Sequence, residues 1–179
     1  MLAIVPVRGD GAKSRLAPVL SPGERAELVR GMLERVLAAC AGATGIERTL
    51  LVTPDPGLAP AGVQVLVDEG RGHPEAIALG LADPRAQPGV LVIMADCPHA
   101  TAESLDALAA AARPLALAPS DDGGVNALAL GGLDGFLPRF GVPAETMIAA
   151  ARAKGLEPAV VRDKRLAFDV DRPSDLARL

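Results

Sequence analysis

Short apolar runs alternate with longer helical patterns along this chain of 179 residues, and this alternation constrains the fold more than any other feature. The runs are rich in Val, Leu and Ile and are continuously apolar, which is typical of strands covered on both faces of a sheet. Strands that alternate with helices form βαβ units with right-handed crossovers. The sequence therefore predicts an α/β fold with a mostly parallel sheet, its strands lying over residues 2–7, 49–53, 63–67, 90–94, 115–118, 126–130 and 158–161.

Capping signals mark where the helices begin. Ser21 is a candidate N-cap, Pro22 suits the first helical position, and Glu24 completes a capping box. The apolar stripe that follows has helical spacing and ends near Gly42. We expect further helices after Thr101, over residues 143–154 and after Pro173. Because no linker or internal repeat divides the chain, we expect a single domain over residues 1–179.

Composition excludes several classes of protein. Aromatic residues make up 2% of the chain, with three Phe and no Tyr or Trp, so a platform that stacks nucleic-acid bases is excluded. The net charge of −4 gives no basic field for a polyanion. No apolar run approaches the roughly 20 residues of a membrane span, and the N-terminus has no signal-peptide pattern. Cys40 and Cys97 form no disulfide framework or metal motif, and we expect a cytoplasmic protein.

The segment after the first predicted strand concentrates positive charge beside glycines. The segment contains three cations, Arg8, Lys13 and Arg15, together with Gly9 and Gly11. It follows a predicted strand, whose carboxyl end should form part of a ligand site. The order and spacing of a Walker loop are absent. The alternative interpretation is a solvated basic loop. The position at a strand end favours phosphate binding.

Three carboxylates are candidate metal ligands. Asp96 ends the apolar strand over residues 90–94, where a carboxylate is costly without a partner, although it could simply cap the next helix. Asp169 and Asp171 precede the last predicted helix, and residues two apart in an extended segment point to the same side. Capping by Asp171 is the alternative there. A divalent cation that bridges nucleotide phosphates is the usual reason for an acid such as Asp96 in a phosphate site.

Several motifs together resemble one enzyme family. They are Val5-Pro6-Val7 leading to Lys13-Ser14-Arg15-Leu16, then Leu20-Ser21-Pro22-Gly23-Glu24-Arg25, Val52-Thr53-Pro54-Asp55, Ala95-Asp96-Cys97-Pro98, Gly124-Val125-Asn126 and Phe168-Asp169-Val170-Asp171-Arg172-Pro173. In this order they resemble the phospholactate and phosphoenolpyruvate guanylyltransferases of coenzyme F-420 biosynthesis, within the molybdopterin-guanylyltransferase-like superfamily. The resemblance implies a Rossmann-like three-layer sandwich of the GT-A nucleotidyltransferase type.

The resemblance also implies a reaction and a set of site residues. A small phosphorylated acid (2-phospholactate, phosphoenolpyruvate or 3-phosphoglycerate) would attack the α-phosphate of GTP or another nucleoside triphosphate, with pyrophosphate leaving. Lys13, Arg15 and Asp96 would be catalytic, and Mg²⁺ would be held by Asp96, Asp169 and Asp171. Asp121, Asp122 and Asn126 would face the acceptor. The nucleotide would contact Pro6, Val7, Arg8, Lys13, Ser14, Arg15, Thr53, Gly70, Gly72 and Asp96.

The chain departs from the family pattern at His73-Pro74-Glu75, where relatives have a polar contact after a glycine-rich stretch. Guanine selectivity therefore stays open, as does a homodimer. Two other functions also stay open at this point. A nucleotide-sugar-dependent glycosyltransferase of the same fold would keep the metal acids but would use a sugar nucleotide. A non-catalytic module would bind the nucleotide without turnover.

Overall fold

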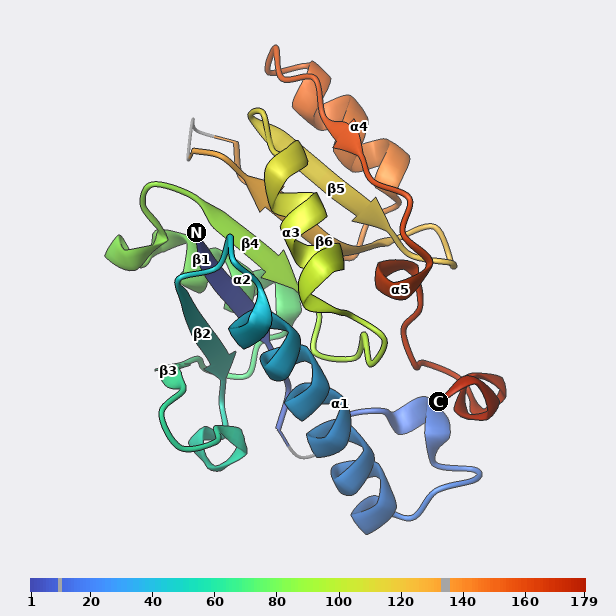
Figure 1. The fold of residues 1–179 in the computed structure, drawn as a ribbon. Helices are drawn as coiled ribbons and strands as arrows, with labels where there is room; N and C mark the ends of the chain where they lie inside the picture. Colours follow the sequence, from blue (N-terminus) through green and yellow to red (C-terminus); the bar gives the residue numbers. More distant parts are fainter. Residues whose placement is uncertain (10, 133–135) are drawn as a thin grey trace.

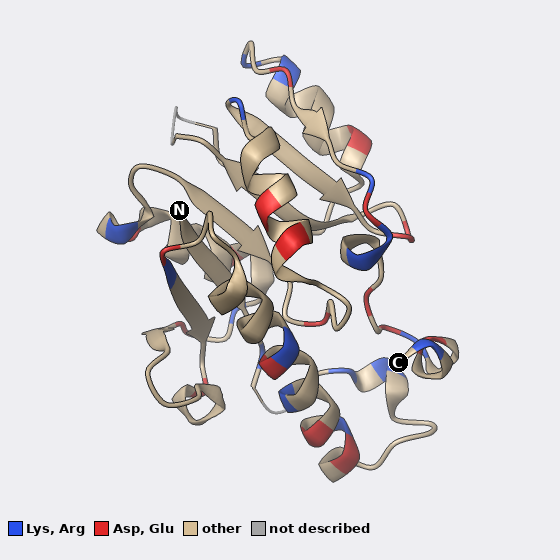
Figure 2. Ribbon diagram, viewed as in Figure 1, with Lys and Arg blue, Asp and Glu red and all other residues tan. Residues whose placement is uncertain are grey.

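All seven predicted apolar runs form strands in the computed structural model, which describes residues 1–9, 11–132 and 136–179. Among the residues of these strands only Arg48 is charged, and Figure 2 shows the charged residues gathered on helices and loops instead. The sheet is therefore an apolar layer that can be covered on both faces. The strands are β1 (Leu2–Pro6), β2 (Arg48–Thr53), β3 (Gln64–Val67), β4 (Val90–Ile93), β5 (Leu115–Pro119), β6 (Val125–Leu130) and β7 (Ala159–Val160).

The strands form one sheet in the order β3-β2-β1-β4-β6-β5-β7. All pairs are parallel except those made by β6, which is antiparallel to both β4 and β5. A tight turn between β5 and β6 reverses the chain, so β6 begins at the edge where the other strands end. The predicted mostly parallel sheet is confirmed, and the start of β6 joins the carboxyl ends of its neighbours.

Helices cover both faces of the sheet, and Figure 1 shows α1 and α3 in front of it with α2 behind. Alternate strand residues divide between two cores: Ala3, Val5 and Leu91 pack toward α1 and α3, whereas Leu2, Ile4 and Val92 pack toward α2 and α4. The predicted three-layer sandwich is confirmed. None of the described helices is both long and apolar enough to cross a membrane. The α-helices are α1 (Pro22–Gly42), α2 (His73–Ala82), α3 (Ala102–Ala111), α4 (Ala144–Arg152) and α5 (Lys164–Ala167).

The capping signals place α1 and α3 correctly. Ser21 and Glu24 form the predicted capping box of α1, and Thr101 caps α3 together with Ser104. The segment after Pro173 is a 3-10 helix rather than an α-helix. The sequence analysis did not predict α2. The 3-10 helices are η1 (Ser14–Leu16), η2 (Pro56–Leu58), η3 (Pro84–Ala86) and η4 (Pro173–Arg178).

Gly80 allows α2 to approach the sheet closely. A Cβ at this position would lie 2.8 Å from Cγ2 of Ile4, which is fully buried in β1. We expect Gly80→Ala to reduce the free energy of unfolding by about 1–2 kcal/mol, because overpacking outweighs the gain in helix propensity. Urea unfolding followed by far-ultraviolet circular dichroism would measure it.

Gly31 provides the matched control for Gly80. It lies within α1, and a Cβ there would meet nothing within 4 Å. Gly31→Ala should therefore increase the free energy of unfolding by up to about 1 kcal/mol. A Gly80→Ala protein at least as stable as the wild type would show that α2 does not depend on this close contact.

Candidate active site

A cavity of about 780 Å³ opens at the edge of the sheet where the parallel strands end. Its volume lies within the range of small-molecule sites. The loop after β1, the start of α2, the end of β4, the β5–β6 turn, residues 140–143 and the segment before η4 all line it. The position agrees with the rule that ligands of open α/β sheets bind beyond the carboxyl ends of the strands.

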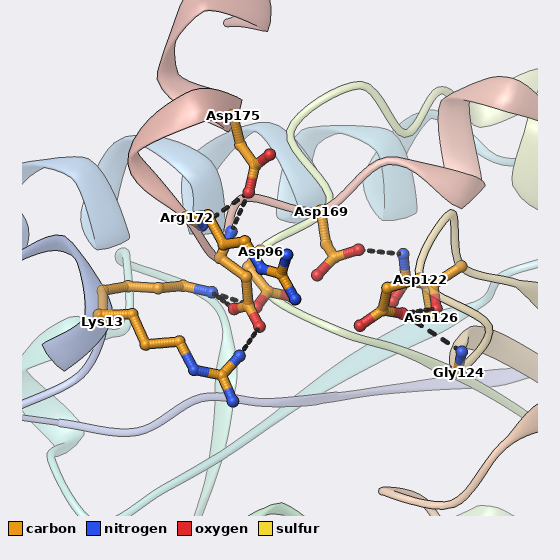
Figure 3. Close-up of polar contacts among 11 residues, drawn as sticks. Lys13, Asp96, Asp122, Gly124, Asn126, Asp169, Arg172 and Asp175 are labelled. Carbon is orange, nitrogen blue, oxygen red and sulfur yellow. Dashed lines mark hydrogen bonds and ion pairs between the residues drawn. The ribbon is translucent and has the colours of Figure 1, made fainter.

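Lys13 connects the loop after β1 to two of the candidate metal ligands. Its Nζ lies 2.5 Å from Oδ2 of Asp96 and 2.9 Å from Oδ1 of Asp171, and the side chain is only 11% exposed (Figure 3). Burial alone would lower the pKa of Lys13. The charges and hydrogen bonds of Asp96 and Asp171 outweigh burial and raise the pKa, so the ammonium group stays protonated.

Backbone conformation fixes the direction of the Lys13 side chain. Lys13 adopts the left-handed conformation with φ 58° at the N-terminal end of η1, which is uncommon for a residue with a Cβ. Arg15, two residues further on, donates from Nη1 to Oδ2 of Asp171 over 2.7 Å. The predicted basic loop thus delivers two cations to the carboxylates, with Arg8 and Ser14 also lining the cavity.

The three predicted metal ligands lie together. Asp96, Asp169 and Asp171 each offer a carboxylate oxygen, and these oxygens lie within 4.8 Å of one another. The backbone N–H of Val170 donates to the carbonyl of Asp96, which joins the two segments directly (3.2 Å). Carboxylate oxygens are the ligands that Mg²⁺ prefers, so this donor set suits that ion.

Asp175 shapes the segment that carries Asp171. Its Oδ2 accepts hydrogen bonds from the backbone N–H groups of Asp171 and Arg172, over 2.9 and 2.6 Å (Figure 3). The helix predicted after Pro173 includes Asp175, but this capping role was not predicted. The spacing of an acid three residues after a helix start, in Arg172-Pro173-Ser174-Asp175, is the signal that indicates this cap.

Asn126 holds Asp169 from the start of β6. Its Nδ2 donates to Oδ1 of Asp169 over 3.2 Å and to the carbonyls of Leu166 and Ala167 over 3.0 and 3.2 Å. Asn126 also lines the cavity, as predicted, and it attaches the C-terminal segment to the sheet. The antiparallel direction of β6, which no sequence motif indicated, brings this amide to the metal ligands.

The other two predicted acceptor residues separate in the structure. Asp122 lines the cavity, and its Oδ1 accepts hydrogen bonds from the hydroxyl of Ser120 (2.5 Å) and the N–H of Gly124 (3.2 Å). Asp121 is not among the residues that line the cavity, and its carboxylate accepts a hydrogen bond from Arg178 (3.0 Å). A direct contact between Asp121 and an acceptor is therefore not supported.

The predicted nucleotide residues divide in the same way. Val7 lines the cavity, whereas Pro6, Thr53, Gly70 and Gly72 are not among its lining residues. Pro6 and Thr53 are buried in β1 and β2, and the Thr53 hydroxyl accepts a hydrogen bond from the N–H of Asp55. Contact of these four positions with the nucleotide therefore stays a prediction.

His73 lines the cavity, whereas the preceding Gly70 and Gly72 do not. Gly72 has φ 127°, a conformation that residues with a Cβ rarely adopt, and a Cβ there would lie 3.2 Å from Nη2 of Arg8, so a larger residue would strain this turn. Burial lowers the pKa of His73; the charges of Asp96 and Asp171 oppose this shift, and those of Arg8 and Lys13 add to it. The imidazole is therefore neutral at pH 7, with one nitrogen available to donate and one to accept.

Asp169 carries the clearest electrostatic cost of the site. Burial raises its pKa to about 6, together with the charges of Asp96, Asp171 and Asp122 and against the hydrogen bond from Asn126. The folded state therefore binds more protons than the unfolded chain between about pH 4 and pH 6, and stability falls as the pH rises through this window.

The Asp169→Asn variant tests this cost. Without divalent cations, we expect the variant to be more stable than the wild type above pH 6, by on the order of 2 kcal/mol, and equal to it near pH 4. Urea unfolding at pH 4, 5 and 7.5 in the presence of a chelator would measure the difference. Glu34→Gln on the exposed side of α1 is the control. The same pH-dependent gain in stability in this variant would contradict the view that the buried charge of Asp169 destabilises the protein.

Comparisons with known proteins agree with this geometry. The family model described as "Guanylyl transferase CofC like" matches residues 1–179. The chain belongs to this family. Members of the CofC-like family are transferases of nucleotidyl groups, and this chain is therefore a nucleotidyltransferase.

Three curated relatives of the CofC-like chain carry different acceptor names. A phosphoenolpyruvate guanylyltransferase from Sphaerobacter thermophilus is 41% identical, covering 99% of this chain and 91% of its own. A 3-phospho-D-glycerate guanylyltransferase from Phenylobacterium zucineum is 39% identical, over 97% and 86%. A 2-phospho-L-lactate guanylyltransferase from Methanosarcina mazei is 32% identical, over 100% and 86%.

The fold of the CofC-like chain also matches solved structures. A nucleotidyl transferase from Methanothermobacter thermautotroptrophicus (Mth528) superimposes with a TM-score of 0.70 and 16% identity, over 99% of this chain and 94% of its own. At this identity the match concerns the fold alone. It confirms the predicted Rossmann-like nucleotidyltransferase architecture.

Proposed function

We propose that this chain transfers a guanylyl group from GTP to the phosphate of a small phosphorylated carboxylic acid, in a reaction that depends on Mg²⁺. An oxygen of the acceptor phosphate attacks the α-phosphorus of GTP, the bond to the β-phosphate breaks, and pyrophosphate leaves. The observation that supports this most directly is the contact of Lys13 with Asp96 and Asp171, which joins the basic loop to the carboxylates inside the cavity.

The basic loop is suited to the triphosphate. Arg8, Lys13 and Arg15 all line the cavity and come from one segment, so their charges act on one region of a ligand. In phosphoryl transfer most of the catalysis comes from alignment and from charge stabilisation. We assign Lys13 and Arg15 to the charge that develops on the leaving pyrophosphate, and Arg8 to the phosphate nearest α2.

The three carboxylates would hold the metal ion. Asp96, Asp169 and Asp171 form a compact set of hard oxygen donors. When bound there, Mg²⁺ would supply positive charge beside the α-phosphate and the leaving group. Asn126 keeps Asp169 oriented through its hydrogen bond.

The acceptor needs no strong base from the protein. A phosphate monoester has a second pKa of about 6 and is mostly a dianion at pH 7, so its attacking oxygen carries no proton. Alignment is the main requirement. The β5–β6 turn with Asp122 and Gly124, together with Phe140 and Val142, lines the end of the cavity away from the basic loop, and we assign the acceptor to this end.

Base recognition has to proceed without aromatic stacking on Tyr or Trp, because the sequence contains neither. We assign the base to the side of the cavity near α2, where His73 and Pro74 line the wall. A neutral imidazole can read a polar base edge by donating or accepting one hydrogen bond.

Pyrophosphate release tests the proposal. The purified chain is incubated with Mg²⁺, each of the four nucleoside triphosphates, and phosphoenolpyruvate, 2-phospholactate or 3-phosphoglycerate. We expect release with GTP and at least one acid, no release after chelation of the metal, and a product mass equal to the acid plus a guanylyl group. No release with any pair would overturn the proposal.

The remaining outcomes identify the two other functions. Transfer from a sugar nucleotide in place of pyrophosphate release would indicate a glycosyltransferase. Binding of GTP by calorimetry with no turnover of any acid would indicate a non-catalytic module.

A further inference from the structure

An aromatic cluster lies outside the residues that line the cavity and packs against the last residues of η4. The rings of His99 and Phe168 are stacked, with centroids 4.7 Å apart and an interplanar angle of 27°. The guanidinium carbon of Arg178 lies 4.1 Å from the centroid of Phe168, which is within the range of cation–π contacts. Phe168 is almost completely buried, so its ring gives Arg178 a fixed surface to rest on.

Arg178 also reaches the β5–β6 turn. Its Nη2 donates to Oδ2 of Asp121 over 3.0 Å, and the two side chains form an ion pair. The backbone N–H of Asp121 donates to the carbonyl of Ala167 over 2.8 Å. Asp121 is therefore attached to the C-terminal part of the chain through both its backbone and its side chain.

The turn that Asp121 belongs to forms one wall of the cavity. Ser120, Asp122, Gly123 and Gly124 line it on either side of Asp121 in the chain. The hydrogen bonds from Ser120 and Gly124 to Asp122 shape the turn internally, but they do not attach it to the rest of the protein. The turn is held at two points: at Asp121, and at Gly123, whose carbonyl accepts a hydrogen bond from the N–H of Ala144 over 2.9 Å. Loss of the Asp121 contact would therefore let Ser120 and Asp122, its neighbours in the chain that line the cavity, shift.

The metal ligands are attached by other contacts. Asn126 holds Asp169, and the backbone of Val170 bonds to that of Asp96. Asp175 accepts the N–H of Asp171. None of these three contacts involves the side chain of Arg178, so its loss should leave the carboxylates in place.

We propose that Arg178 is a positioning residue for the acceptor end of the site. Fixed on the Phe168 ring, it holds Asp121 and so sets where the turn over residues 120–124 meets the acceptor. The inference rests on the proposed function and adds a residue to it that touches neither the nucleotide loop nor the carboxylates. It also gives Asp121 a structural role in place of the predicted acceptor contact.

Steady-state kinetics of Arg178→Gln with GTP and the acceptor acid test the inference. We expect the KM for the acceptor to rise about fivefold to tenfold, because an exposed ion pair and a cation–π contact are both lost. The KM for GTP and the dissociation constant of Mn²⁺ should stay within about twofold of the wild type. Arg178→Lys, which keeps the charge, should restore most of the acceptor affinity.

A double-mutant cycle separates this role from a general loss of stability. If the pair acts as a unit, Asp121→Asn combined with Arg178→Gln should raise the acceptor KM no further than Arg178→Gln alone. Arg152→Gln is the matched control, because Arg152 pairs with Glu157 on the surface at similar exposure (59% and 72%, against 53% and 54% for Arg178 and Asp121).

Two results would overturn the inference: an unchanged acceptor KM in Arg178→Gln, or an equal rise in the Arg152→Gln control. If Arg178→Gln does not fold, Asp121→Asn carries the same test, and an acceptor KM equal to the wild type in that variant overturns it. Failure of the proposed function is recognised separately, because the wild type would then release no pyrophosphate.

Discussion

Asp96→Asn is expected to lower kcat for pyrophosphate release by about 10³-fold or more, with the protein still folded. The substitution removes the negative charge from the carboxylate that follows β4 and that contacts Lys13 over 2.5 Å. It also leaves Asp169 and Asp171 as the only charged members of the set. Single-turnover release of pyrophosphate would measure the chemical step, and calorimetry with Mn²⁺ would show weakened metal binding.

Asp83→Asn serves as the control for this prediction. Asp83 is buried to a similar degree (10% exposed, against 17% for Asp96) and pairs with Arg85 at η3, outside the cavity lining. Its variant should lose stability but keep kcat. If Asp96→Asn retained more than about a tenth of the wild-type turnover, the assignment of Asp96 as a metal ligand would be wrong.

Lys13→Met is expected to change two measurements in opposite directions. Loss of the ammonium group should lower kcat by about 10²- to 10³-fold, because its charge no longer stabilises the leaving pyrophosphate. The affinity for Mn²⁺ without nucleotide should rise severalfold, because the ammonium that contacts Asp96 and Asp171 no longer competes with the ion. Activity assays and calorimetry on the same preparation would test both changes.

Arg15→Met is the companion variant. Arg15 contacts Asp171 but is 69% exposed, so solvent screens its charge far more than that of the buried Lys13. We expect its loss to reduce kcat by about tenfold, with a smaller effect on Mn²⁺ binding. Weaker binding of Mn²⁺ by Lys13→Met than by the wild type would contradict the view that Lys13 occupies part of the cation site.

The apolar strands and their caps were predictable because they depend on local chemistry. Ser21 and Glu24 are three residues apart, and the capping box they form needs no tertiary contact. By contrast, α2 was not predicted. Gly72 and Pro74 indicate a loop by composition, yet Gly72 provides the turn into the helix and Pro74 occupies its first turn. Burial of Ala76 and Ile77 against the sheet stabilises this helix.

The charged residues of the candidate site were predictable from their type and their position in the chain. Which side chains of the other motifs face the cavity was not predictable. Lys13 and Arg15 follow β1, and Asp96 follows β4, at one edge of the sheet. Asp169 and Asp171 lie between α5 and η4, and the backbone of this segment bonds to that of Asp96. Other predicted nucleotide residues, such as Thr53 and Gly70, belong to matching motifs but are not among the residues that line the cavity. A motif identifies the segment that approaches a ligand, whereas the backbone conformation decides which of its side chains face it.

The amino-acid sequence by itself determined the layered α/β architecture, because continuous apolar runs between amphipathic helices can be buried in no simpler way. It also determined which charged groups would gather at the sheet edge. Only the tertiary structure decided how these groups pair. The antiparallel direction of β6 brings Asn126 to Asp169, and Arg178 forms an ion pair with Asp121, which does not line the cavity. These contacts join residues 43 and 57 positions apart, and their geometry depends on packing that no local pattern encodes.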